Sequence, residues 1–241
     1  MEFQEFRSLF CQSCQANGIP VPQEAQIQAF WRFTQHLMEV NSHTNLTAIR
    51  SIPDVIPKHY ADSLLAAEHL PQGARVLDLG CGPGFPSIPL AIARPDLSVV
   101  ALDSTDKKVK FVAESADLLG LTNLTAVSGR AEDAAIRKKL GSFDAVVSRA
   151  VARLNVLSEL CLPYVKKNGI FLAMKAAKGE EELQEAQKGI GVLGGTVVAL
   201  HKKDLVMESG TEQRYLIEIQ KIAPTPPQYP RAYAAIVKKP L

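Results

Sequence analysis

Residues 78–85 read DLGCGPGF, and this stretch decides the fold of the 241-residue chain. An apolar run at residues 75–79 leads into it and predicts a buried strand, and a helical segment begins near Pro86. Glycine adopts positive φ values and lets a backbone approach a ligand closely. Three alternate glycines between a strand and a helix therefore predict a ligand-binding loop at the carboxyl end of the first strand of an α/β sheet.

Downstream of this loop, short β-rich runs alternate with helical segments. The predicted strands are residues 75–79, 98–103, 124–128, 143–148, 169–175, 196–201 and 214–220. The predicted helices are residues 86–93, 105–119, 131–140, 155–165 and 180–193. Such alternation predicts a mostly parallel seven-stranded sheet with helices on both faces. Residues 202–212 carry no helical pattern, so the last two strands are expected to form an antiparallel pair at one edge.

The N-terminal part of the chain is predicted to be helical, because apolar residues recur there at helical spacing. A first helix ends before Asn17, a second covers residues 23–40, a polar stretch interrupts at 41–45, and a third covers 53–70. The predicted organisation is a helical extension (1–72), a ligand-binding sheet domain (73–222) and a Pro-rich, basic tail (223–241). Cys11 and Cys14 are interpreted as small apolar residues on one helix face, because no second cysteine pair follows at zinc spacing.

The composition argues against a membrane protein. No run of 18 apolar residues occurs, and the acidic start MEFQE lacks the basic region of a signal peptide. The net charge of +2 gives no whole-protein argument for nucleic acid. We therefore expect a cytoplasmic monomer without membrane contact and without a bound metal.

Two classes of ligand compete for the glycine loop. Dinucleotide sites favour a third glycine at position 85, but Phe85 stands there. The carboxylate of Asp78 disfavours a diphosphate and suits the amino group of an amino acid. Asp103 ends the second strand, where a carboxylate can accept hydrogen bonds from both ribose hydroxyls of either ligand. The balance favours S-adenosylmethionine, and a nicotinamide-dependent dehydrogenase is the alternative.

The ends of the third and fourth strands provide further candidates. Ala131 and Glu132 follow the third strand, where their backbone could meet an adenine edge or where the acid could simply open a helix. Arg149 ends the fourth strand and is expected to face the ligand crevice, with an ion pair to a neighbouring carboxylate as the alternative or additional role.

Several motifs together resemble one family. They are DLGCGPGFPSIP at 78–89, NSHTNLTAI at 41–49, HYADSL at 59–64, FDAVVSRA at 143–150, Lys175, and YPR at 229–231. Over nearly its full length the chain resembles the bacterial 16S ribosomal RNA (guanine-N7)-methyltransferase G family, also called glucose-inhibited division protein B. Two positions depart from that pattern: Ser87 stands where members usually have Gly, and AYAAIV follows Arg231.

The resemblance implies a Rossmann-like class I methyltransferase fold with an N-terminal helical extension, S-adenosyl-L-methionine as cofactor, and 7-methylguanosine in the 530 loop of 16S rRNA as product. Pattern and resemblance together give the expected cofactor contacts as Asp78, Gly80, Gly82, Gly84, Phe85, Asp103, Ser104, Thr105, Ala131, Glu132 and Arg149. Arg149 and Lys175 are candidates for positioning the reactants. The candidate rRNA contacts are Asn45, His59, Lys175 and Arg231.

Guanine N7 carries a free lone pair at neutral pH, so we hypothesise in-line methyl transfer without an obligatory general base. No catalytic residue is therefore assigned. The expected partner is 16S rRNA or the 30S ribosomal particle. A non-catalytic rRNA-binding or assembly protein, and a methyltransferase with another substrate, remain as alternatives.

Overall fold

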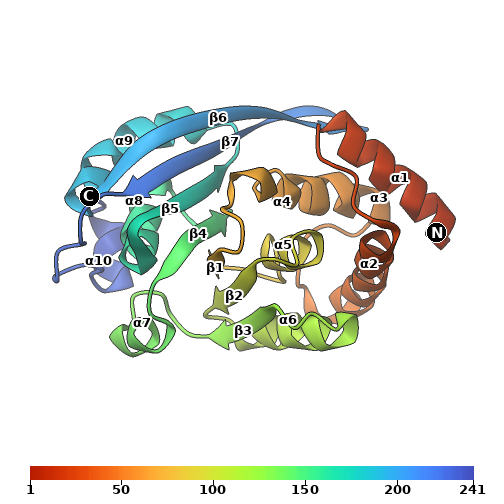
Figure 1. The fold of residues 1–241 in the computed structure, drawn as a ribbon, viewed down its shortest axis with the longest axis horizontal. Coiled ribbons are helices and arrows are strands. Elements are labelled where there is room, and N and C mark those ends of the chain that lie inside the picture. Colours follow the sequence, from red (N-terminus) through yellow and green to blue (C-terminus); the bar gives the residue numbers. More distant parts are fainter.

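The computed structural model describes residues 1–241, and a twisted seven-stranded sheet runs through its centre (Figure 1). The strands are β1 (Arg75–Leu79), β2 (Ser98–Asp103), β3 (Leu124–Ser128), β4 (Phe143–Arg149), β5 (Val165–Lys175), β6 (Gly195–Met207) and β7 (Gly210–Lys221). Their order is β3-β2-β1-β4-β5-β7-β6. β1 to β5 pair in parallel, and β7 pairs antiparallel with both β5 and β6. The predicted fold class is confirmed.

Residues 202–212 differ from the prediction of a link. β6 and β7 extend through them and meet in a tight hairpin, with Met207 paired to Gly210. Exposed and half-buried residues alternate along β6, as expected of an edge strand with one solvated face. Polar side chains on the solvated face of an edge strand are therefore compatible with the observed β structure.

Helices cover both faces of the sheet. They are α5 (Ser87–Ala93), α6 (Asp106–Leu119), α7 (Ala134–Leu140), α8 (Leu154–Cys161) and α9 (Gly179–Val192). Neighbouring residues of β1 point to opposite faces, so that Val76 belongs to a core with α5 and α6, and Leu77 to a core with α8 and α9. The Pro-rich residues 223–230 form no helix or strand, as predicted, but α10 (Tyr233–Lys238) was not predicted and buries Ile236.

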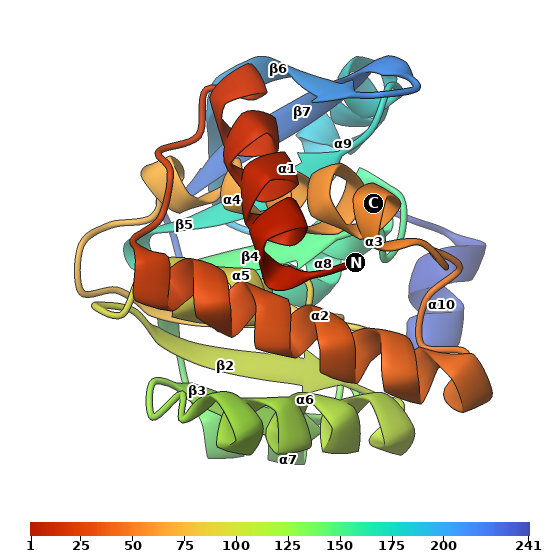
Figure 2. The ribbon, with the colours of Figure 1, turned by 90° about the vertical axis from the view of Figure 1, so that its right-hand side faces the viewer.

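The N-terminal helices share the core of the α5–α6 face. They are α1 (Phe3–Ala16), α2 (Glu24–Thr44), α3 (Ile52–Val55), a π-helix (Ile56–Ala61), α4 (Asp62–Leu64) and a 3₁₀ turn (Ala67–His69). Figure 2 shows α1 and α2 crossing in front of the sheet. Tyr60 contacts Phe30 and Phe33 of α2, and Phe33 contacts Phe85 of the glycine loop, with ring centroids 5.1–6.1 Å apart. None of the helices is long and apolar enough to span a bilayer.

Two N-terminal predictions need correction. α2 continues to Thr44, so only Asn45 of the polar stretch 41–45 lies beyond the helix, in a left-handed conformation with φ 53°. The buried Asn41 side chain bonds the Ile49 carbonyl and the Thr47 amide, and so connects the helix to the segment that follows it. The predicted third helix is a chain of short helical segments.

Cys14 is a free thiol in the N-terminal core, as the small-residue interpretation predicts, and burial raises its pKa to about 12.

Candidate active site

A cavity of about 490 Å³ lies at the carboxyl ends of β1, β2, β3 and β4, where open α/β sheets bind ligands. Its volume is within the range of small-molecule sites. Ten predicted residues line it: His59, Gly80, Gly82, Phe85, Asp103, Ser104, Thr105, Ala131, Glu132 and Arg149. The sheet thus brings residues from four separate strand ends and from the N-terminal extension to one cavity.

The glycine loop after β1 is fixed to the neighbouring strand. The amides of Gly80 and Cys81 donate to the Leu102 carbonyl at 2.8 and 3.1 Å. Gly80 has φ 79°, and a Cβ there would lie 2.3 Å from Cγ2 of Val151. Only glycine fits this position, because both the backbone conformation and the available space exclude a side chain.

Asp103 is held in a fixed orientation at the end of β2. Its Oδ2 accepts from the Gly82 amide at 3.0 Å, and its Oδ1 accepts from the Thr105 amide at 2.8 Å. Each carboxylate oxygen has further lone pairs, and the residue lines the cavity. A pair of ligand hydroxyls would find two preoriented charged acceptors there.

Asp78 and Gly84 do not line the cavity, and their contact with the cofactor stays a prediction. The Asp78 side chain lies under the loop, fully buried, and its Oδ2 accepts from the Ser87 amide at 2.9 Å. A Cβ on Gly84, with φ 96°, would lie 2.4 Å from Ile88 Cδ1. Both residues therefore hold the loop against α5.

The pH dependence of stability should reveal this buried carboxyl. Burial raises the pKa of Asp78 from 3.8 to about 7. Between these values the folded chain keeps a proton that the unfolded chain releases, so stability falls as pH rises through this window. Asp78→Asn does not titrate, so its stability relative to the parent chain should rise from pH 4 to pH 8, by up to about 4 kcal/mol.

Urea unfolding at pH 4, 6 and 8 measures this difference. Asp117→Asn, the same change on the exposed side of α6, is the control and should differ from the parent equally at every pH. A constant difference for Asp78→Asn as well would show that Asp78 is charged throughout the range.

The N-terminal extension supplies the opposite wall of the cavity. The His59 ring stacks on Phe85, with centroids 4.1 Å apart and an interplanar angle of 15°. Thr47 Oγ1 lies 2.9 Å from His59 Nε2, and both residues line the cavity. An aromatic stack with a hydroxyl at its edge therefore lines the same cavity as Asp103.

The neighbours of His59 determine its protonation. Arg149 Nη2 lies 3.0 Å from His59 Nδ1 and can only donate, so Nδ1 accepts and the proton lies on Nε2, which donates to Thr47 Oγ1. Burial, with the charge of Arg149, lowers the pKa of His59 to about 3. Thr47 Oγ1 also accepts from the Ile49 amide at 3.2 Å. Its own O–H is therefore available to a ligand.

Arg149 lies at the cavity wall, as predicted, and also forms the predicted ion pair. Its Nη1 is 2.6 Å from Asp62 Oδ2 and donates to the Lys58 carbonyl at 3.0 Å. Asp62 also pairs with Arg214 of β7 at 2.8 Å. All three side chains are largely buried, at 10–15% exposure. The network connects the π-helix region, β4 and β7 at one side of the cavity.

Two candidate rRNA contacts already have partners within the protein, which makes them weaker candidates for contact with RNA. Lys175 is buried, pairs with Glu182 at 2.7 Å and donates to the Ala152 carbonyl. Arg231 pairs with the fully buried Glu159 at 2.6 Å. Neither lines the cavity. Asn45 is exposed, ends α2 and accepts from Arg50 at 2.7 Å, so its contact with RNA stays a prediction.

Other cavity residues were not among the predicted cofactor contacts. Lys108, Arg130 and Tyr233 line the cavity, from α6, the segment after β3, and α10. The Arg130 guanidinium lies 5.3 Å from the Tyr233 ring centroid. Leu46 and Thr47 belong to the NLTAI motif quoted above, and that motif is the sequence feature that could have identified them as cavity residues. Nothing local in the sequence marked Tyr233.

The chain is similar to several known proteins in sequence and in fold. A family model described as rRNA small subunit methyltransferase G matches residues 26–210. "Ribosomal RNA small subunit methyltransferase G" of Limosilactobacillus fermentum is 43% identical in sequence, and the alignment covers 100% of this chain and 99% of the relative. The protein of the same name from a Geobacillus strain is 44% identical, and the alignment covers 93% of this chain and 94% of the relative. An O-methyltransferase from Bacillus cereus, solved in complex with SAH, is similar in fold at 16% identity, covering 91% of this chain and 100% of its own, with a TM-score of 0.58.

Proposed function

Since the chain belongs to the rRNA small subunit methyltransferase G family, we propose that it transfers a methyl group from S-adenosylmethionine to N7 of a guanine in the 530 loop of 16S rRNA. The observation that carries this proposal is that the strand ends and the N-terminal extension line the same cavity. The strand ends supply an acidic ribose site, and the NLTAI segment with His59 supplies an aromatic wall.

The residues present fit S-adenosylmethionine. The two preoriented oxygens of Asp103 suit the two ribose hydroxyls, and the backbone near Ala131 and Glu132 suits the adenine edge. Gly80 and Gly82 line the cavity and have no Cβ, which suits close approach by the amino acid part of the ligand. When bound, S-adenosylmethionine supplies an electrophilic methyl group on a sulfonium sulfur.

The chemistry proposed for this chain is positioning without proton removal. Guanine N7 takes the methyl carbon with its own lone pair as the carbon–sulfur bond breaks, so no base is required. His59 agrees with this account, because its Nδ1 accepts from Arg149 and its Nε2 donates to Thr47. Good alignment of reactants contributes about 7–11 kcal/mol in the best cases.

The aromatic wall is the proposed site of the target base. Bases in RNA loops are splayed out and stacked on aromatic or guanidinium planes. The Phe85–His59 stack provides such a plane, and the available Thr47 hydroxyl can donate to an acceptor on the base edge. His59 and Thr47 come from the N-terminal extension and Phe85 from the glycine loop, so the extension contributes to substrate recognition in our proposal.

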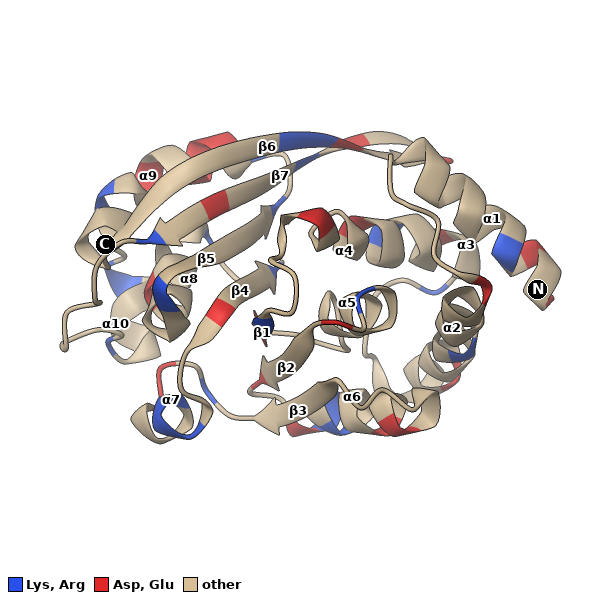
Figure 3. Ribbon diagram, in the orientation of Figure 1, with Lys and Arg blue, Asp and Glu red and all other residues tan.

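The rRNA backbone is proposed to contact basic residues at the cavity rim. Lys and Arg are distributed over several elements, among them α6 and α7, rather than gathered on one (Figure 3). Of these, Lys108 and Arg130 line the cavity, which makes them better candidates than Lys175 or Arg231. The protein is further proposed to act as a cytoplasmic monomer on 16S rRNA or the 30S particle.

Incubation of purified protein with labelled S-adenosylmethionine and 16S rRNA or 30S particles tests the proposal. We expect one methyl group per 16S rRNA, located by mass mapping to a 530-loop guanine as 7-methylguanosine. Thr47→Val should lower the single-turnover rate, whereas Thr122→Val, on the surface after α6, should leave it unchanged. Binding of rRNA without methyl transfer would support the assembly-protein alternative instead.

The absence of a general base is tested in the same assay. Single-turnover rates as a function of pH should show no limb that one carboxylate or histidine substitution removes. An acid limb that disappears in His59→Gln would overturn this part of the mechanism.

A further inference from the structure

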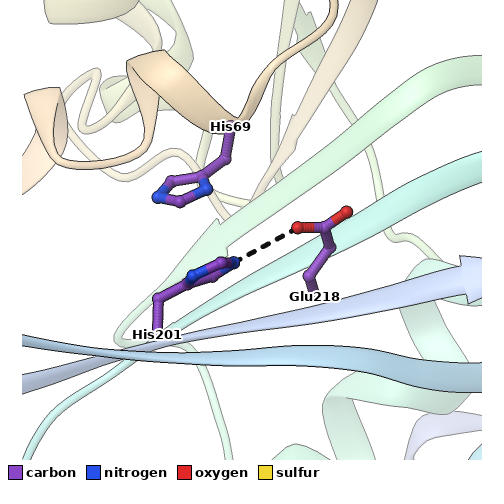
Figure 4. Close-up of side chains that lie close together, drawn as sticks. All are labelled: His69, His201 and Glu218. Carbon is purple, nitrogen blue, oxygen red and sulfur yellow. Dashed lines mark hydrogen bonds and ion pairs between the residues drawn. The ribbon is translucent and has the colours of Figure 1, made fainter.

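A second group of ligand-type side chains lies away from the cavity, where the 3₁₀ turn before β1 meets the β6–β7 hairpin. His69 comes from that turn, His201 from β6 and Glu218 from β7, and Figure 4 shows the three side chains converging. One ligand atom from each lies within 4.8 Å of the others. None of the three lines the cavity of the proposed active site.

The sheet itself fixes two of the three side chains. His201 is paired with Leu216 and Glu218 with Ala199, so the two residues are diagonal neighbours on one face of the hairpin. His201 Nε2 is 3.3 Å from Glu218 Oε2. A tetrahedral ion with bonds of 2.0–2.2 Å separates its ligand atoms by about 3.3–3.5 Å. These two atoms already have that spacing.

His69 completes the group from the other side. Its ring centroid lies 4.2 Å from that of His201, and its side chain is only 12% exposed. Its Nε2 is buried and makes no hydrogen bond, although Glu68 Oε1 is 3.4 Å away. A buried imidazole nitrogen without a hydrogen bond is unusual and indicates a missing partner.

The surrounding charges permit a divalent cation. Lys203 is the nearby positive group, and it pairs with Glu68 at 2.9 Å, so the two charges compensate each other. Glu218 contributes the remaining negative charge, and an imidazole binds a metal ion in its neutral form. The local charge without an ion is therefore about −1.

We propose that His69, His201 and Glu218 bind a divalent transition metal ion, with zinc as the best match. Two imidazole nitrogens and one carboxylate are a ligand set of such ions, and tetrahedral coordination suits Zn²⁺. The side chains of His201 and Glu218 are 32% and 24% exposed, so water can take the fourth position. Binding moves the proton of His201 to Nδ1 and replaces the contact between His201 and Glu218.

The bound ion would act as a structural clamp. It would join the 3₁₀ turn that precedes β1 to the hairpin at the edge of the sheet. Asn17 already joins the end of α1 to the same hairpin, through two hydrogen bonds to Val206. A metal bond at His69 would add a further connection between the N-terminal extension and β6–β7, beside the Glu68–Lys203 and Asp62–Arg214 ion pairs.

The test uses tag-free, full-length protein, stripped with a chelator and titrated with Zn²⁺ against a chelating dye. We expect one equivalent per chain. His201→Ala and Glu218→Gln should each weaken binding by at least about 100-fold, the upper end of the effect of losing an outer-shell partner. Zinc in 100-fold excess over the Kd of the parent chain should raise the Tm of the parent chain by about 5–11 °C, and that of the variants by no more than about 2 °C.

Two control variants separate this site from other zinc ligands. His43→Ala removes an exposed histidine of α2, and Cys11→Ser removes the more accessible thiol of the Cys11/Cys14 pair; both should bind zinc like the parent chain. Circular dichroism and S-adenosylmethionine binding should be unchanged in Glu218→Gln, which shows that the variant is folded. Absence of zinc binding, or binding that survives His201→Ala, would overturn the proposal.

Discussion

Asp103→Ala is expected to weaken the binding of S-adenosylmethionine by about 100- to 10,000-fold. The carboxylate is proposed to accept from two ribose hydroxyls, and each hydrogen bond to a charged group contributes about 1.5–3 kcal/mol. Two such bonds give about 3–6 kcal/mol, at 1.4 kcal/mol per factor of ten. The substitution also releases the Gly82 and Thr105 amides, so the loop loses its connection to β2.

Isothermal titration calorimetry with S-adenosylmethionine measures this effect. The matched control is Asp106→Ala, which removes a carboxylate three residues along the chain that bonds Ser128 and does not line the cavity. The control should change the affinity for S-adenosylmethionine by less than about threefold, because the exposed charge of Asp106 lies outside the cavity and is screened by solvent and salt. Wild-type affinity in Asp103→Ala would remove the ribose role from our proposal.

The bounds of β1, β2 and β3 could be predicted from the sequence to the residue. Each strand is a short apolar run between turn residues, so local pattern and tertiary structure agree. The β6–β7 hairpin was predicted too short, because Lys202, Lys203 and Asp204 look like loop residues. On an edge strand, such residues occupy the solvated face.

The positions of the site residues could be predicted from the sequence, but the side chains with which they form ion pairs could not. Strand order places Asp103 and Arg149 at one sheet edge, and both line the cavity. The same reasoning placed Lys175 there, but Glu182 of α9 pairs with it and buries it. Asp78 precedes the loop in sequence but lies beneath it, because side chains alternate across a strand. Long-range pairs of this kind leave no signal in a local pattern.

Asp62→Ala is expected to cost the fold about 3–5 kcal/mol, the usual effect of removing one member of a buried ion pair. Asp62 accepts from Arg149 at 2.6 Å and from Arg214 at 2.8 Å, and both guanidinium groups are about 85% buried. Without Asp62, two positive charges remain close together in a poorly solvated place. Arg214 retains Glu212 at 2.9 Å, but that carboxylate is 55% exposed and compensates little.

Urea unfolding measures the loss, and for a chain of this length the Tm should fall by about 6–20 °C. Glu114→Ala is the surface control: it removes the exposed Lys110–Glu114 pair, whose side chains are 77% and 51% exposed, and should cost less than about 0.5 kcal/mol. Asp62→Asn retains an acceptor and should fall between the two. A loss below about 1 kcal/mol for Asp62→Ala would mean that water already screens the network. Since Arg149 lines the cavity, the same variant should also bind S-adenosylmethionine more weakly, which connects the stability of this network to the geometry of the site.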